Sequence, residues 1–116
     1  MTTNKAYTDL SQSKILTKIL PLESADYHYI VQGEQSYFYP YSLSIDDVKD
    51  YDEEIKYIPC WSLAALLSIL PKYEIYNNGE TIQLDVSLEA LAIEGDETLL
   101  DLVVNMIIHL HELNLL

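Results

Sequence analysis

The first pattern along the chain is helical, with apolar residues at near-helical spacing from position 10 to position 20. Thr8 or Asp9 stands at its start as a candidate N-cap, because a short polar side chain there accepts hydrogen bonds from the amides of the first turn. Pro21 ends the pattern, since proline cannot continue a helix. Residues 1–6 precede it, and we expect a flexible tail there.

The spacing then changes to a period of two, in which Tyr27, Tyr29 and Val31 alternate with His28 and Ile30. After a polar segment that contains Gly33, the alternation resumes over 37–41, with a tyrosine at every second position. A period of two residues is typical of half-buried β-strands, and glycine suits the connection. These residues predict a first β-hairpin.

Helical spacing returns between Ser44 and Ile58, in a strongly acidic stretch. The apolar positions are three or four residues apart: Ile45, Val48, Tyr51, Ile55 and Ile58. Ser44 and Asp47 are placed like a capping box. The pattern predicts a short acidic helix.

An apolar segment rich in leucine and alanine runs from Trp61 to Leu70, between Pro59 and Pro71. Ser62 is available as its N-cap. We expect a short helix that is nearly buried.

A second hairpin is predicted between Lys72 and Val86. Its strands cover 72–76 and 81–86, and the intervening Asn77-Asn78-Gly79 is a strong turn signal. Asn-Gly tolerates the positive φ that a tight hairpin turn requires.

The longest helical pattern runs from Glu97 to about Leu113, and its polar residues fall on one stripe: Thr98, Asp101, Asn105, His109 and Glu112. Val104 and Ile108 lie beside that stripe rather than opposite it, so one contact surface need not cover every apolar group. A homodimer interface through this C-terminal helix is one way in which the remaining apolar groups could be covered. Wrapping of the helix by neighbouring segments is the other.

The order of these elements predicts the fold class. It is α+β, with two β-hairpins forming an antiparallel sheet and about three helices packed on it. A chain of 116 residues with 49% apolar residues is suited to one domain, here residues 1–116.

Composition indicates the cellular compartment of the protein. The single cysteine, Cys60, cannot form an intramolecular disulfide, and no apolar run resembles a secretory leader or reaches membrane-spanning length. We therefore expect a cytoplasmic protein with no membrane partner.

Charge is the strongest compositional signal. Six basic residues, all lysine, oppose 19 carboxylates, for a formal net charge of −13. Such a field repels a phosphate backbone, and arginine, which binds phosphate and guanine in bidentate fashion, is absent from the sequence. Direct nucleic-acid binding is therefore not expected, whereas a basic protein partner is compatible with this charge.

No metal site is predicted. His109 and Glu112 lie one helical turn apart, but His109 and His111 point about 200° away from each other on a helix and cannot chelate one ion together. The only other histidine, His28, falls on a predicted strand.

The acidic run does not form a calcium loop. An EF-hand that began at Asp50 would place Ile55 where glycine is required and Trp61 where the bidentate glutamate belongs. We expect a solvated acidic face, made of Asp46, Asp47, Asp50, Asp52, Glu53 and Glu54. Docking of a basic patch on a partner protein by these residues is the alternative.

No catalytic or cofactor-binding residue is predicted. Cys60 lies in an apolar context typical of a buried core cysteine, although a catalytic thiol paired with a histidine is the alternative. The three glycines are isolated from one another, so no Gly-rich phosphate loop exists. Ten tyrosines suit half-buried strands or a protein interface, and the candidates for partner contact are Tyr37, Tyr39 and Tyr41, with Tyr27 and Tyr29 on the same hairpin face.

Three stretches together resemble a family of short uncharacterised proteins encoded on prophages and conjugative elements of gut bacteria. They are QSKILTKILPLESADYHY, IPCWSLAALLSILP and MIIHLHELNLL. The resemblance implies no activity, cofactor or site residue. It implies a context in which short acidic proteins often bind other proteins and some imitate DNA.

The sequence therefore predicts a non-enzymatic accessory protein of a mobile element that acts through protein–protein binding. The alternative is an acidic DNA mimic whose carboxylates occupy the basic cleft of a DNA-binding protein.

Overall fold

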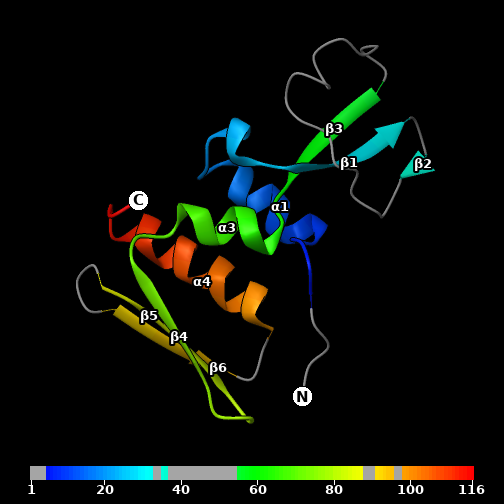
Figure 1. Ribbon diagram of the computed structural model, residues 1–116. Coiled ribbons are helices and arrows are strands. Elements are labelled where there is room, and N and C mark those ends of the chain that lie inside the picture. The colour runs from blue at the N-terminus through cyan, green and yellow to red at the C-terminus, as the bar shows by residue number, and fades with distance from the viewer. Residues whose placement is uncertain (1–4, 33–34, 37–54, 88–90, 96–97) are drawn as a thin grey trace. The chain divides into compact units, whose positions relative to one another are not determined.

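The fold is α+β, as predicted. The computed structural model describes residues 5–32, 35–36, 55–87, 91–95 and 98–116 (Figure 1). Its helices are α1 (Leu10–Thr17), the short 3-10 helix η1 (Leu22–Ser24), α3 (Leu63–Ile69) and α4 (Leu99–Glu112). Its strands are β1 (Tyr27–Gln32), β2 (Gln35–Ser36), β3 (Ile55–Cys60), β4 (Tyr73–Asn77), β5 (Ile82–Val86) and β6 (Leu91–Gly95).

The strands form two separate antiparallel sheets, with the orders β2-β1-β3 and β4-β5-β6, rather than the one sheet expected from the sequence. In the predicted first hairpin, β1 covers the strand expected at 27–31, whereas the strand expected at 37–41 lies outside the described residues. The partners of β1 are instead β2, within the predicted connection, and β3, and the predicted second hairpin gains β6 as a third strand. The chain divides into two compact units, an N-terminal unit of Tyr7–Ala65 and a C-terminal unit of Met1–Ala6 with Leu66–Leu116. The single domain of residues 1–116 stays a prediction.

In the N-terminal unit, β1 pairs along its whole length with β3, from Tyr27 opposite Cys60 to Gln32 opposite Ile55. Helix α1 packs against β3. The helix contributes Leu16 to the core, where Trp61 is also fully buried. The contact of α1 with β3 brings two segments that are far apart in sequence into one core.

Strand β3 shows that the predicted acidic helix is wrong over its last residues, 55–58. Ile55 and Ile58 fit a helical period, but isoleucine and tyrosine also suit a pleated strand, and pairing with β1 satisfies the backbone there. Pro59 has no N–H to donate, which a strand at the edge of its sheet tolerates. The rest of the predicted helix, 44–54, lies outside the described residues.

The predicted helix starts are confirmed at α1 and α3. Asp9 and Gln12 form a complete capping box at α1, with the Gln12 amide donating to Asp9 Oδ1 at 2.8 Å. At α3, the Ala65 amide donates to Ser62 Oγ at 3.1 Å. Ser62 is itself held by Asp26, whose carboxylate accepts both its amide and its hydroxyl. Two helices thus begin where a short polar side chain can accept an amide hydrogen.

In the C-terminal unit, α4 lies against β5 and β6 (Figure 1). Leu84 and Val86 of β5 are buried, as is most of the apolar surface of α4. Thr98 caps α4 by accepting the Asp101 amide at 3.1 Å. Lys5, in the expected flexible tail, forms an ion pair with Asp101 at 2.9 Å.

The predicted second hairpin is confirmed as β4 and β5. Its turn is closed by the Asn78 amide, which donates to the Thr81 carbonyl at 3.2 Å, and Gly79 has a φ of +92°. Asn78 does not share this positive φ. Its side-chain oxygen instead accepts the amides of Glu80 and Thr81, so Asn78 acts as a side-chain cap of the turn.

Val104 on α4 is only 1% exposed and Ile108 is half-buried. Val104 therefore gives no support to a homodimer interface along this helix, and the interface stays a prediction. Within the described residues, none of the helices has both the length and the apolar character that a membrane span needs.

Candidate functional site

The partner-binding residues predicted from the sequence all fall within 37–54, outside the described residues. They are Tyr37, Tyr39, Tyr41, Asp46, Asp47, Asp50, Asp52, Glu53 and Glu54. The tyrosine face and the acidic face therefore stay predictions, as does the carboxylate spacing that a DNA mimic needs.

Tyr29, expected on the same surface as those tyrosines, is a core residue instead. It is 4% exposed, and its hydroxyl donates to the Thr8 carbonyl at 2.8 Å. Burial raises the pKa of its phenol above the ordinary value. The ring of Tyr27 lies beside that of Tyr7, with 6.1 Å between the centroids. On this strand, tyrosine serves packing.

Cys60 lies in a buried polar cluster with Thr8 and Ser13. Its thiol donates to the Thr8 carbonyl at 3.3 Å and accepts from the Thr8 hydroxyl at 3.4 Å. The hydroxyls of Thr8 and Ser13 are 2.8 Å apart, and Thr8 Oγ1 also accepts the Trp61 amide. Among the described residues, no buried side-chain nitrogen or oxygen lacks a hydrogen-bond partner.

In this cluster the Cys60 side chain is fully buried, with 0% exposure. Burial raises the pKa of Cys60 above its ordinary value, although hydrogen bonding to Thr8 acts in the opposite direction. A nucleophilic cysteine needs the reverse, a lowered pKa and solvent access. The expectation that Cys60 is a core residue is confirmed.

The histidines lie on two elements, β1 and α4. His28 is 2% exposed, and its ring and that of Tyr57 form a T-shaped pair with 6.5 Å between the centroids. His109 and His111 are exposed near the end of α4. In the described part of the chain, no three residues among His, Cys, Asp and Glu lie close enough together to hold a metal ion.

The candidate site that sequence reasoning missed is the outer face of the β4-β5-β6 sheet. We define the outer face as the side opposite the buried Leu84 and Val86. Paired residues of antiparallel strands share a side, so the register assigns the side chains to this face. It comprises Glu74 and Tyr76 of β4, Gln83 and Asp85 of β5, and Ala92 and Glu94 of β6.

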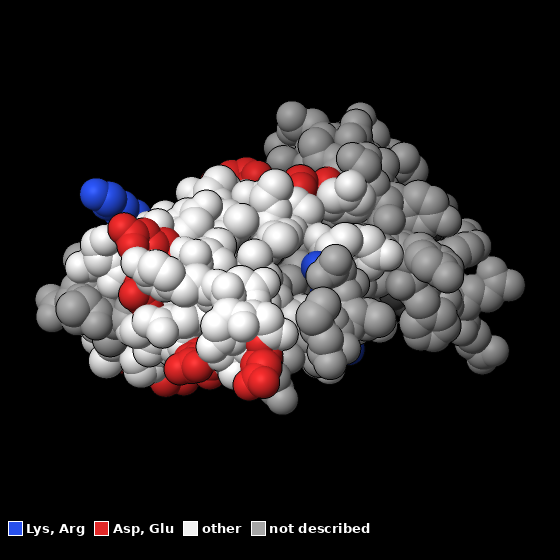
Figure 2. Space-filling model, turned by 60° about the horizontal axis from the view of Figure 1, so that its bottom comes forward, with Lys and Arg blue, Asp and Glu red and all other residues white. Residues whose placement is uncertain are grey.

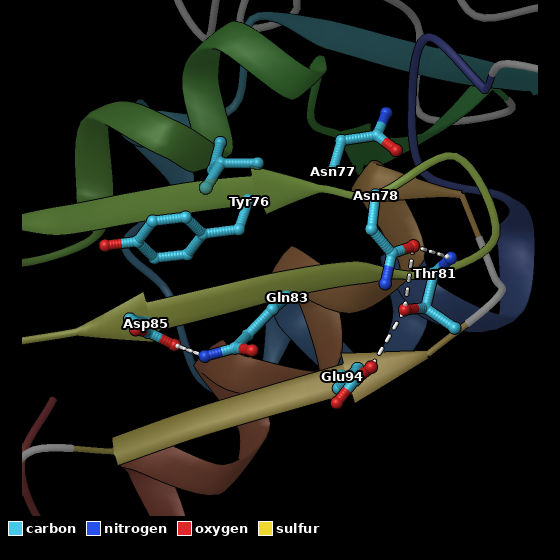
Figure 3. Close-up of a pocket in the computed structure, with 8 residues that line it drawn as sticks. Tyr76, Asn77, Asn78, Thr81, Gln83, Asp85 and Glu94 are labelled. Atoms are coloured by element: carbon cyan, nitrogen blue, oxygen red, sulfur yellow. Dashed lines mark hydrogen bonds between the residues drawn. The ribbon is translucent and has the colours of Figure 1, made fainter.

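A shallow depression of about 610 Å³ lies at the turn end of this sheet (Figure 3). Tyr76 is 51% exposed there, and its register partner is Gln83. In Figure 3, Asn77 points away from the group formed by Tyr76, Gln83 and Asp85.

Hydrogen bonds hold the polar side chains of this face in place. Gln83 Nε2 donates to Asp85 Oδ1 at 2.7 Å, and Thr81 Oγ1 donates to Glu94 Oε1 at 2.8 Å. The Tyr76 hydroxyl donates to Glu74, and this bond and the carboxylate's charge raise the pKa of the Tyr76 phenol. The face presents carboxylate oxygens beside an exposed aromatic ring.

This arrangement suits a basic side chain. Carboxylates accept charge-assisted hydrogen bonds from Lys or Arg, and a tyrosine ring attracts a cation placed over it. Neither cysteine nor histidine lines the depression, so its lining offers no nucleophile of the kind considered above. The sequence signal was present, because Glu74 and Tyr76 alternate with Ile75, but β6 was needed to complete the face.

A second exposed surface lies on α1 in the N-terminal unit. A shallow groove of about 350 Å³ is lined by Lys14, Ile15, Lys18 and Ile19, and Ile15 is 45% exposed.

On the side of the molecule drawn in Figure 2, the described carboxylates form separate small groups with uncharged surface between them.

The comparisons with known proteins add no relative. No family model, no curated protein and no solved structure matches this chain. The resemblance to mobile-element proteins therefore stays a prediction.

Proposed function

We propose that this chain is a non-enzymatic protein-binding module whose outer sheet face receives a partner segment carrying lysine or arginine. The observation that supports this most directly is the exposed Tyr76 ring on a face that also carries Glu74, Asp85 and Glu94. An incoming cation would meet carboxylates that Gln83 and Thr81 already orient. The role as an accessory protein of a mobile element rests on the resemblance alone.

The net charge of −13 supports the same class of partner, since it attracts basic segments at long range. It also creates a difficulty for any test, because a strongly acidic protein binds basic peptides weakly at many places. The experiment must therefore separate this face from the rest of the acidic surface.

The test is an NMR titration of the isotope-labelled chain with a short arginine-rich peptide, at low and at high salt. We expect the largest shift changes at Tyr76, Gln83 and Glu94, and weaker binding as salt rises. The Asp85→Asn/Glu94→Gln double variant should lose most of the affinity.

The matched control removes the same charge elsewhere. Glu23→Gln/Glu112→Gln changes two exposed carboxylates, one on η1 and one at the end of α4. If this control loses as much affinity as the double variant on the sheet, or if the shifts spread evenly over the acidic surface, the proposed face is wrong.

A further inference from the structure

Among the described strands, β4 lies at one edge of its sheet, since the order is β4-β5-β6 and β5 is its neighbour. Its last four residues, Glu74 to Asn77, are all exposed, including Ile75 at 38% and Tyr76 at 51%. Exposed apolar and aromatic side chains on an edge strand favour pairing with a further strand.

The hydrogen-bond register shows which backbone groups face that edge. The Ser87 amide donates to the Lys72 carbonyl at 2.9 Å, and the Asn78 amide donates to the Thr81 carbonyl at 3.2 Å. Hydrogen-bonded pairs alternate along an antiparallel ladder, so the even-numbered residues of β4 bond to β5. The N–H and C=O groups of Tyr73, Ile75 and Asn77 therefore point away from β5.

The usual protections of an edge strand are absent from Tyr73–Asn77. The segment contains no proline and no lysine, and its pairing with β5 runs without a bulge. Lys72 lies just before the strand, and Glu74 is its only charged residue. The other edge, β6, is flanked on both sides by residues outside the described ranges, so we base the inference on β4.

We propose that β4 pairs antiparallel with β4 of a second copy of this chain, about a two-fold axis at Ile75. Only residues whose backbone groups face the edge can form hydrogen-bonded pairs with the second copy. In this register, Ile75 pairs with Ile75 of the second copy, and Tyr73 pairs with Asn77 of the second copy. This register pairs all five residues of the strand.

Charge selects this register over its neighbours. A two-fold axis at Ile75 places Glu74 opposite Tyr76 of the second copy, so no like charges meet across the new ladder. An axis at Glu74 would oppose two carboxylates directly, which destabilises a strand pair. An axis at Tyr76 would leave Tyr73 and Glu74 without a strand partner. The sequence of β4 is therefore complementary to itself in one register, as a two-fold interface requires.

The dimer has a distinctive salt dependence. Each copy carries a formal charge of −13, so long-range repulsion opposes association, and salt screens that repulsion. Dimerisation should therefore strengthen as salt rises, whereas binding of a basic partner to the outer face should weaken. The inference does not depend on the proposed function, and the two can fail separately.

The test is sedimentation equilibrium of the full chain over a wide range of concentration, at low and high salt, with two β4 variants. Ile75→Lys brings two ammonium groups together at the axis, although it lowers the net negative charge. Ile75→Pro removes an N–H that faces the edge and bonds to no residue of β5. We expect a concentration-dependent dimer for the wild type and loss of the dimer in both variants.

The control is Ile15→Lys, the same substitution at an isoleucine of similar exposure on α1. It should leave the dimer intact, and far-UV circular dichroism should show that every variant is folded. A wild type that stays monomeric at all concentrations in high salt would overturn the proposal, as would a dimer that survives both β4 variants.

The register of the β4–β4 pairing can be tested separately by NMR. In a sample mixing labelled and unlabelled chains, the Hα of Glu74 should show an intermolecular contact with the Hα of Tyr76 of the second copy, because these residues form a close non-hydrogen-bonded pair. A dimer that lacks this contact uses another surface.

Discussion

The phenol of Tyr29 donates a hydrogen bond of 2.8 Å to the backbone carbonyl of Thr8, which also accepts the thiol of Cys60. The bond joins β1 to the residue just before the N-cap of α1. A tyrosine expected at a partner surface thus secures the start of a helix from inside the core.

Replacing Tyr29 with phenylalanine should destabilise the protein by about 1 kcal/mol, because one buried hydrogen bond is lost while the ring remains. Urea denaturation gives the free energy of unfolding. Tyr27→Phe is the control, since Tyr27 is half-buried against Tyr7, and its effect should stay within about 0.5 kcal/mol. Equal effects of the two substitutions would contradict the role given to the Tyr29 hydroxyl.

Stability should fall at alkaline pH. The pKa values of the Cys60 thiol and the Tyr29 phenol are both raised in the folded state, chiefly by burial, from ordinary values of 9.0 and 10.0. The unfolded chain therefore loses these protons first, so their contribution is complete below about pH 9 and declines as the pH rises above it. Denaturation midpoints measured across this range should fall.

The stability of the variant Tyr29→Phe/Cys60→Ala should decline less steeply with rising pH than that of the wild type, whatever its stability at neutral pH. If stability falls with the same slope against pH in both proteins, other groups cause the loss of stability at alkaline pH.

Cys60 should react slowly with a thiol reagent in the folded protein and rapidly in urea. The side chain is fully buried, and burial holds its pKa above the ordinary value. Because the chain has one cysteine, the absorbance change reports on this residue alone. A native rate close to that of free glutathione would contradict this prediction and support the catalytic-thiol alternative.

Gly79→Ala should destabilise the β4–β5 hairpin by about 1–2 kcal/mol, which is the cost of a left-handed backbone for a residue with a Cβ. The φ of Gly79 is +92°, and no atom lies within 4 Å of the position that the new Cβ would occupy, so the cost comes from the backbone and not from a clash. Thermal unfolding monitored by circular dichroism measures it. Glu80→Ala in the same turn should change stability by less than about 0.5 kcal/mol.

Sequence reasoning located the elements that carry strong local signals. The Asn-Gly turn, the caps at Asp9 and Ser62, and the long apolar pattern of α4 each depend on residues close together in the chain. Such signals act before any distant contact forms.

The elements that sequence reasoning missed depend on a distant partner. Residues 55–58 carry a spacing that serves a helix as well as a strand, and the pairing with β1 decides between them. Strand β6, with the sequence LAIEG, shows weak strand propensity and forms beside β5. Because β6 contributes Glu94, the outer face could not be predicted from the sequence either, since it also depends on a pairing between distant segments.

Trp61 gives the N-terminal unit an optical signal of its own. It is the only tryptophan, it is fully buried, and its Nε1 donates to Ser24 Oγ at 2.9 Å. Its fluorescence should shift to longer wavelength when Tyr7–Ala65 unfolds, whereas α4, the longest of the described helices, contributes helical ellipticity from the C-terminal unit. Recording both signals in one denaturant titration measures whether the two units lose structure in a single cooperative transition or one after the other.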